Sequence, residues 1–193
     1  MIVIWKVSEY DGKTEKAEYE RCLSKRAHAY LKQMLKKVYG IEKTDMWYGE
    51  NGKPSLRGIK GVEFNLTHCD GLIGLVMGEK PAGIDAEKVR PLCMAAVRKT
   101  CAETEVERIL ASGKKDEMFF RYFTLKEAYG KAVGVGLSYP LKEVTFELAS
   151  GKITCNRDGY CFKQYVIDNE YIVSVCYQVE NNQRQKGKKT AKA

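Results

Sequence analysis

The alternation of apolar and polar positions in the first half of the chain predicts mainly strands around one helix. Short apolar runs predict strands over residues 2–7, 45–48, 62–67, 72–77 and 83–87. The last two strands are expected to form a hairpin through the turn-rich segment 78–81. Apolar residues at helical spacing predict a helix that Ser24 caps and Gly40 ends.

The second half begins with helical spacing and ends with strand spacing. Helices are predicted over residues 93–100, 103–110 and 116–133. Apolar alternation then predicts strands of an antiparallel meander over residues 144–148, 152–155, 160–167 and 171–179. Runs of strands beside runs of helices indicate an α+β fold.

Acidic residues in the middle of the chain form the strongest candidate for chemistry. Asp85 and Glu87 alternate along a predicted strand and therefore share one face, while Glu127 and Lys131 share one stripe of the predicted helix 116–133. Three carboxylates suit a magnesium ion that binds substrate phosphates, and an ammonium group can hold a phosphate as a point charge. The pattern therefore suggests metal-assisted phosphoryl transfer.

Simpler interpretations exist for each of these residues. Asp85 and Glu87 could be a solvated strand end, and Glu127 with Lys131 could be an ordinary surface pair. Against the second interpretation, helix 116–133 is apolar nearly all round, which is typical of a buried helix. His28 is expected to be a surface residue only.

Four short segments add to this picture. They are Gly-Lys-Pro-Ser-Leu at 52–56, Phe-Asn-Leu-Thr-His-Cys at 64–69, Gly-Ile-Asp-Ala-Glu at 83–87 and Phe-Thr-Leu-Lys-Glu-Ala-Tyr-Gly-Lys at 123–131. In sequence and order they resemble the motifs of the 4′-phosphopantetheinyl transferases of the surfactin-synthetase type. The chain departs from those motifs at Thr67 and Cys69, usually serines, at Ala86, usually a larger aliphatic residue, and at Phe123, often tryptophan.

The resemblance implies an architecture that periodicity does not show. It implies two similar α+β halves related by pseudo-twofold symmetry, with the active site in the cleft between them. We expect an N-terminal half over residues 1–84 and a C-terminal half over residues 85–179. Residues 180–193 are expected to be a basic, flexible tail.

The resemblance also implies a reaction and roles for individual residues. The implied reaction transfers the 4′-phosphopantetheine group of coenzyme A to a serine of an apo carrier protein and releases adenosine 3′,5′-bisphosphate. The implied Mg²⁺ ligands are Asp85, Glu87 and Glu127. The implied coenzyme A contacts are Lys53, Thr67, His68, Lys126 and Lys131. Glu127 and Lys131 are the predicted catalytic residues, and either Glu127 or a metal-bound water could accept the serine proton.

Charge and composition limit the remaining functions. The net charge is +8, of which five basic residues within 183–193 contribute five, so the remainder carries only +3. A basic transferase suits an acidic carrier protein. A nucleic-acid-binding protein and a catalytically degenerate homologue that only binds carriers are the alternatives, although no nucleic-acid recognition motif is present.

The predicted location follows from what the sequence lacks. No apolar run is long enough to cross a bilayer, and the N-terminal residues do not resemble a secretory signal. We therefore expect a cytoplasmic protein that does not associate with membranes, and the chain length suits a monomer. The pattern does not reveal which carrier protein is modified.

Overall fold

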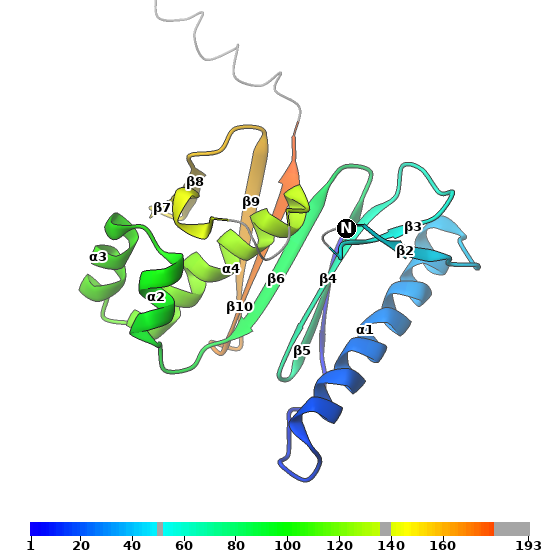
Figure 1. The fold of residues 1–193 in the computed structure, drawn as a ribbon, viewed down its shortest axis with the longest axis horizontal. Coiled ribbons are helices and arrows are strands. Elements are labelled where there is room, and N and C mark those ends of the chain that lie inside the picture. Colours follow the sequence, from blue (N-terminus) through cyan, green and yellow to red (C-terminus); the bar gives the residue numbers. More distant parts are fainter. Residues whose placement is uncertain (50–51, 136–139, 180–193) are drawn as a thin grey trace, which may run out of the picture.

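The computed structural model describes residues 1–49, 52–135 and 140–179. Two three-stranded antiparallel sheets run through the centre, with the long helix of the first half on one side and the helices of the second half on the other (Figure 1). This arrangement confirms the predicted α+β class. The expected tail at 180–193 lies outside the described residues. Within the described residues, no helix is both long enough and apolar enough to span a membrane.

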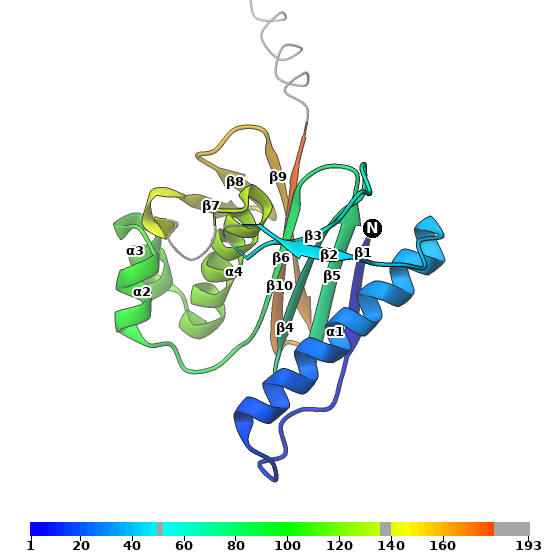
Figure 2. The same cartoon turned by 45° about the vertical axis from the view of Figure 1, so that its right-hand side comes forward.

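The first half holds one sheet, one helix and a small hairpin. Its elements are β1 (Ile2–Lys6), α1 (Lys16–Tyr39), β2 (Met46–Tyr48), β3 (Pro54–Leu56), β4 (Glu63–Cys69) and β5 (Leu72–Gly78). The sheet has the order β1-β5-β4, and β2 pairs with β3. Helix α1 packs on β4 and β5, as Figure 2 shows from the side.

The second half has the same elements, together with two short α-helices and a 3-10 helix. Its elements are β6 (Ala82–Lys88), α2 (Met94–Thr100), α3 (Glu103–Ala111), α4 (Lys115–Val133), the 3-10 helix η2 (Leu141–Glu143), β7 (Phe146–Ala149), β8 (Lys152–Cys155), β9 (Tyr160–Ile167) and β10 (Tyr171–Gln178). The sheet has the order β6-β10-β9, and β7 pairs with β8. Helix α4 packs on β6 and β10.

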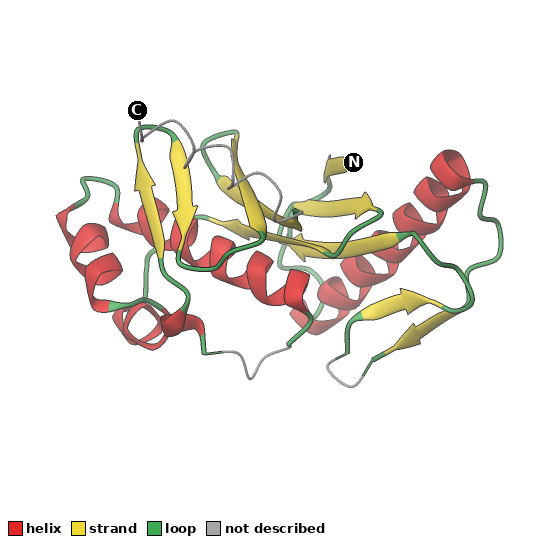
Figure 3. Cartoon of the chain, turned by 90° about the horizontal axis from the view of Figure 1, so that it is seen from above, coloured by secondary structure: helices red, strands yellow, loops and turns green. Residues whose placement is uncertain are grey.

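The two halves share one connectivity. In each half a first strand leads through a long helix and a small hairpin to two final strands, and the last strand lies in the middle of the sheet. Seen from above, helices lie at both ends of the molecule with strands between them, and one two-stranded hairpin stands apart at the right (Figure 3). The prediction of two similar halves is therefore confirmed. The predicted boundary between residues 84 and 85 falls inside β6.

Two predicted strand pairings are wrong. Strands β5 and β6 do not form a hairpin, because β5 pairs with β4 and β1, and β6 pairs with β10. The actual hairpin joins β4 and β5 through Asp70 and Gly71, a dipeptide that suits a two-residue turn, and Gly71 has a φ of 82°. The last four strands are likewise not one meander, since among the described strands β7 and β8 pair only with each other.

Helix α1 begins at Lys16, so Ser24 is an interior residue and not the predicted cap. The polar residues before Ser24 are good helix formers, and the buried stripe already begins at Leu23. The stripe continues at four-residue spacing through Ala27 and Leu31. The predicted end at Gly40 is correct, because this glycine has a left-handed conformation and its N–H bonds the Lys36 carbonyl at 3.0 Å.

A group of side chains joins the halves next to the end of β6. The hydroxyl of Tyr171, which is fully buried, donates to Oε1 of Glu9 at 2.9 Å, and Lys88 lies 2.7 Å from Oε2 of the same carboxylate. Gly71 makes room for this group, since a Cβ there would lie 2.3 Å from the Tyr171 hydroxyl. The contact fixes the loop after β1 against β6 and β10.

Candidate active site

The two sheets meet along β4 and β6, where side chains replace the missing backbone pairing. Oδ1 of Asn65 accepts the backbone N–H of Ile84 at 2.9 Å, and Oγ1 of Thr67 accepts that of Ala86 at 3.2 Å. Both side chains on β4 are buried. We call this contact between β4 and β6 the seam. Because side chains alternate along a strand, Asp85 lies on the opposite face of β6 from Ile84 and Ala86, between the two halves.

Helix α4 lies unusually close to the beginning of β6. A Cβ on Gly83 would lie 2.1 Å from the carbonyl oxygen of Ala128 and 2.5 Å from the backbone nitrogen of Ala132. Only glycine permits this approach, which explains the glycine at the start of the Gly-Ile-Asp-Ala-Glu segment. The approach brings the next turn of α4, with Lys131, over β6.

Lys131 and Asp85 form an ion pair across this contact. The ammonium nitrogen of Lys131 lies 2.7 Å from Oδ1 of Asp85 and donates to the Ile84 carbonyl at 3.1 Å. Asp85 is 6% exposed, and its Oδ2 is buried with no hydrogen-bond partner within the described part of the chain. A buried, unpartnered carboxylate oxygen is costly, so this oxygen would gain from a cation or a hydrogen-bond donor.

Glu87 and Glu127 lie near Asp85 and respond to its charge. Burial raises the pKa of Glu127, and the negative charges of Asp85 and Glu87 raise it further. Burial likewise raises the pKa of Glu87, against the lowering effect of Arg90, whose guanidinium donates to Oε2 of Glu87 at 2.7 Å. The structure therefore brings the three predicted acids into one electrostatic neighbourhood.

The donor set fits a hard cation in chemistry, although the acids are not already arranged around one. Carboxylate oxygens are preferred by Mg²⁺, and Oδ2 of Asp85 has no competing partner among the residues that the structure describes. Among residues 1–49, 52–135 and 140–179, no group of three or more acidic, histidine or cysteine side chains forms a ready metal cage. The ammonium group of Lys131 instead balances part of the negative charge of these carboxylates through its ion pair with Asp85.

The predicted nucleotide contacts of the first half lie around this centre. Lys53, on the loop between β2 and β3, donates to the Ala132 carbonyl at 3.3 Å, and burial lowers its pKa. His68 is exposed at the end of β4, where partial desolvation and the charge of Lys131 lower the pKa of the imidazole. The Thr67 hydroxyl is already engaged with Ala86 in the seam and lies 3.5 Å from Asp85.

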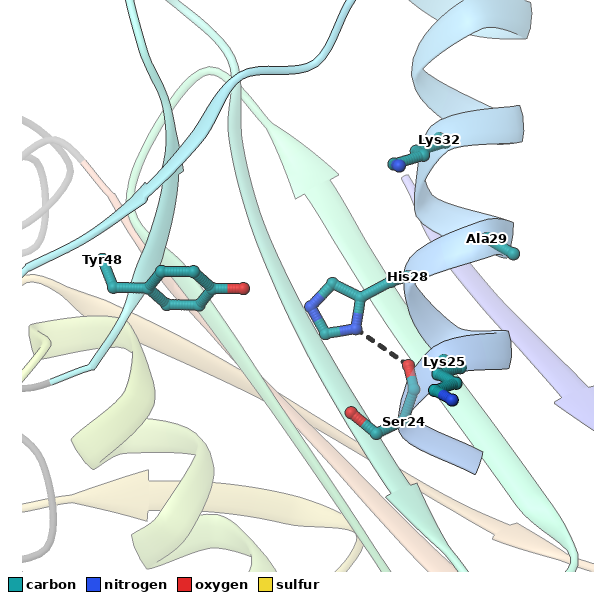
Figure 4. Close-up of a pocket in the computed structure, with 6 residues that line it drawn as sticks. All are labelled: Ser24, Lys25, His28, Ala29, Lys32 and Tyr48. Atoms are coloured by element: carbon teal, nitrogen blue, oxygen red, sulfur yellow. Dashed lines mark hydrogen bonds between the residues drawn. The ribbon is translucent and has the colours of Figure 1, made fainter. Parts of the chain in front are cut away.

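A hollow of about 400 Å³ on the first half contains residues that the sequence analysis missed. It is lined by Ser24, Lys25, His28, Ala29, Lys32 and Tyr48. Figure 4 shows the Tyr48 hydroxyl directed at the His28 ring, whose Nδ1 bonds the Ser24 carbonyl at 2.8 Å. His28 is half-buried on the wall of this hollow, and its proximity contributes to the lowered pKa of His68. The spacing of Lys25, His28 and Lys32 places them on one helix face, which the sequence could have revealed.

Lys126 does not lie where the resemblance implies. Its side chain is 0% exposed and forms an ion pair with Glu105, with 2.8 Å between Nζ and Oε2. It also donates to the carbonyls of Leu141 and Val144. The expected phosphate contact is corrected, because the ammonium group faces the core of the second half and has acceptors for all its hydrogens.

Comparisons with known proteins give one consistent result. The family model ACPS, described as the 4′-phosphopantetheinyl transferase superfamily, matches residues 81–176. The 4′-phosphopantetheinyl transferase Sfp of Bacillus subtilis is 26% identical over 155 residues, which cover 76% of this chain and 69% of that protein. A second Bacillus subtilis 4′-phosphopantetheinyl transferase is 30% identical over 149 residues, covering 72% of this chain and 66% of that protein.

One further relative and one solved structure are also similar to the chain. The 4′-phosphopantetheinyl transferase psf-1 of Bacillus pumilus is 33% identical over 134 residues, covering 65% of this chain and 57% of that protein. The chain therefore spans between 57% and 69% of the length of these three relatives. Among solved structures, the Thermotoga maritima holo-[acyl-carrier-protein] synthase shares 24% identity at a TM-score of 0.45, covering 52% of this chain and 64% of that chain.

Proposed function

Because the chain belongs to the 4′-phosphopantetheinyl transferase superfamily, we propose that it modifies apo carrier proteins. The reaction transfers the 4′-phosphopantetheine group of coenzyme A to a serine hydroxyl and releases adenosine 3′,5′-bisphosphate. The observation that carries this proposal is the buried Asp85. One of its oxygens is paired with Lys131, and the other has no partner in the described part of the chain. Such a centre suits a diphosphate bound through a cation.

The metal part of the proposal rests on three carboxylates. Asp85, Glu87 and Glu127 would hold Mg²⁺, which when bound neutralises charge on the pyrophosphate and so favours attack and departure of the leaving phosphate. The raised pKa values of Glu87 and Glu127 support a cation site, because burial and mutual repulsion make the ionised groups unfavourable until positive charge arrives.

The remaining charge of the donor would be held by basic side chains on both halves. Lys131 is the proposed contact of the pyrophosphate, since its partly exposed ammonium group already lies at the centre of the seam. Lys53 of the first half donates to the Ala132 carbonyl near the end of α4, the helix that carries Lys131. The hollow lined by Lys25, His28, Lys32 and Tyr48 is suited to the nucleotide. His68, whose pKa is lowered in part by His28 of this hollow, is the proposed 3′-phosphate contact.

Glu127 is the proposed general base for the serine hydroxyl. A carboxylate with a raised pKa is a better proton acceptor at neutral pH than an exposed one, which supports this role. The acceptor would be an acidic carrier, because the net charge of +8 favours encounter with a negatively charged surface. We further propose a cytoplasmic monomer, since both sides of the site come from one chain.

A direct assay tests the proposal. The chain is incubated with coenzyme A, Mg²⁺ and a panel of apo fatty-acid, polyketide and nonribosomal-peptide carrier proteins, and the intact mass of each carrier is measured. At least one carrier should gain the mass of a single 4′-phosphopantetheine group, and the same carrier with its acceptor serine changed to alanine should not. A panel in which no carrier gains mass would reject the proposal.

A further inference from the structure

The ion pair between Lys126 and Glu105 is the most deeply buried pair of opposite charges in the described part of the chain. The exposed fractions of the two side chains are 0% and 2%. The three hydrogens of the Lys126 ammonium group are matched by three acceptors, which are Oε2 of Glu105 at 2.8 Å and the carbonyls of Leu141 and Val144. No hydrogen remains for a phosphate.

The carboxylate of Glu105 is also fully used. Its Oε2 accepts the backbone N–H of Ala102 at 2.9 Å, at the start of α3, and its Oε1 accepts that of Phe146 at 2.9 Å, at the start of β7. The pair therefore ties one point of α4 to α3, to η2 and to β7. A charge network that is satisfied throughout specifies one arrangement of the segments that it joins.

The position of this point on α4 matters because Glu127 is the next residue. Successive residues of a helix are about 100° apart around the axis, so fixing the direction of Lys126 also fixes the direction of Glu127. On its other side α4 is held against β6 by the contact between Gly83 and Ala128. The helix is thus held on two sides of the candidate metal ligand.

We propose that the Lys126–Glu105 pair is a positioning device, which sets the rotation of α4 and so directs Glu127 toward Asp85 and Glu87. Lys126 makes no contact with the donor. The catalytic part of this inference rests on the proposed transferase activity. Its structural part rests only on the contacts of the two side chains.

The charge pair itself suggests the test. Removing one partner leaves the other charge buried and unpaired, which disturbs the surrounding segments, whereas removing both charges does not. The informative variants are Lys126→Met, Glu105→Gln and the double variant. Lys142→Met is the matched control, because Lys142 is an exposed lysine on η2, the segment that Lys126 contacts.

Four quantities are measured for each variant, at a temperature where circular dichroism shows it folded. They are Tm, kcat and KM with coenzyme A, and the calorimetric affinity for adenosine 3′,5′-bisphosphate. Lys126→Met should lower Tm and reduce kcat by about tenfold or more, with nucleotide affinity within about twofold of wild type. The double variant should recover Tm and bring kcat to within about threefold of wild type.

Other results would overturn the inference. Nucleotide affinity about tenfold weaker in the double variant would make Lys126 a donor contact. A folded Lys126→Met variant with wild-type kcat would remove the positioning role. If Lys126→Met does not fold, the double variant decides, since it must fold and turn over. Inactive wild-type protein would reject the proposed function. If the change in Tm of the double variant equals the sum of the changes in the two single variants, the two side chains do not interact and the ion pair is rejected.

Discussion

The ammonium group of Lys131 on α4 lies 2.7 Å from Oδ1 of Asp85 on β6. The positive charge of Lys131 is thus paired with one oxygen of a buried carboxylate. The other oxygen, Oδ2, has no hydrogen-bond partner among the described residues. The two halves are joined here by charge as well as by packing, because Lys131 also reaches Thr67 of the first half at 3.5 Å.

Lys131→Met should destabilise the metal-free protein, because neither oxygen of the buried Asp85 carboxylate is then paired with a cation. The expected loss of unfolding free energy is about 1–3 kcal/mol, since the lysine is partly exposed. Mg²⁺ should raise the Tm of this variant more than that of wild type, as thermal unfolding with and without the metal would show. Lys115→Met, on the exposed start of α4, is the control. Equal metal-induced shifts in all three proteins would contradict the prediction.

Glu127→Gln separates the chemistry of this carboxylate from its structural role. We expect kcat to fall by about a hundredfold or more, because the variant lacks both a metal ligand and a proton acceptor. Its Tm should equal or exceed that of wild type, since a neutral amide is not repelled by Asp85 and Glu87. Glu107→Gln, on an exposed position of α3, is the matched control for both measurements. Near-normal turnover of Glu127→Gln would remove its assigned role.

The acid pair should make metal-free stability depend on pH in an unusual direction. Burial raises the pKa of Glu87 and of Glu127, so the folded state retains protons that the unfolded state has already lost. Their contribution to the free energy of unfolding therefore falls as pH rises from about 4.3, the usual glutamate pKa, through the raised folded values. Mg²⁺ binds the ionised groups, so its affinity should increase over the same range.

Thermal unfolding across this pH range, with and without Mg²⁺, measures both effects. In the double variant Glu87→Gln and Glu127→Gln, the stability of the metal-free protein should no longer decline as pH rises over this range. Glu9 provides an internal contrast, because its hydrogen bond with Lys88 lowers the pKa of Glu9, so its contribution is lost as pH falls through the folded value. A decline that persists unchanged in the double variant would assign it to other groups.

His68→Ala tests the assignment of the 3′-phosphate. Partial desolvation and the charge of Lys131 lower the pKa of His68, and a bound phosphate would favour the protonated ring. Binding of adenosine 3′,5′-bisphosphate should therefore take up a proton in wild type and not in the variant, as calorimetry in two buffers would measure. The variant should bind coenzyme A more weakly, with a smaller loss for 3′-dephospho-coenzyme A. Equal losses with both donors would refute the contact.

Local patterns predicted most of the elements, because helix and strand periods are properties of neighbouring residues. They predicted α4 to within one residue and placed Asp85 and Glu87 on one strand. Strand pairing depends on distant partners, and the predicted hairpin failed because β6 pairs with β10, which begins more than 80 residues later. The periodicity of one segment carries no information about such a partner.

The sequence motif likewise could not predict the direction in which each of its side chains points. Lys126 and Lys131 belong to one segment, yet Lys131 faces β6 and Lys126 faces Glu105 on α3. Their directions depend on which elements pack on each side of α4. The hollow also required the fold, since Tyr48 meets the basic face of α1 only through the position of the β2–β3 hairpin.

Gly83→Ala should separate α4 from β6 and so dismantle the site. The added Cβ would lie 2.1 Å from the Ala128 carbonyl and 2.5 Å from the Ala132 nitrogen, and neither backbone atom can rotate away as a side chain could. We expect a loss of about 3 kcal/mol or more in the free energy of unfolding, measured by denaturant titration. The matched control is Gly78→Ala, where a Cβ meets nothing within 4 Å and φ is not positive. Because Asp85 is on β6 and Glu127 on α4, the folded fraction of Gly83→Ala should also turn over more slowly than wild type. Wild-type stability in this variant would mean that the close approach of α4 to β6 does not exist.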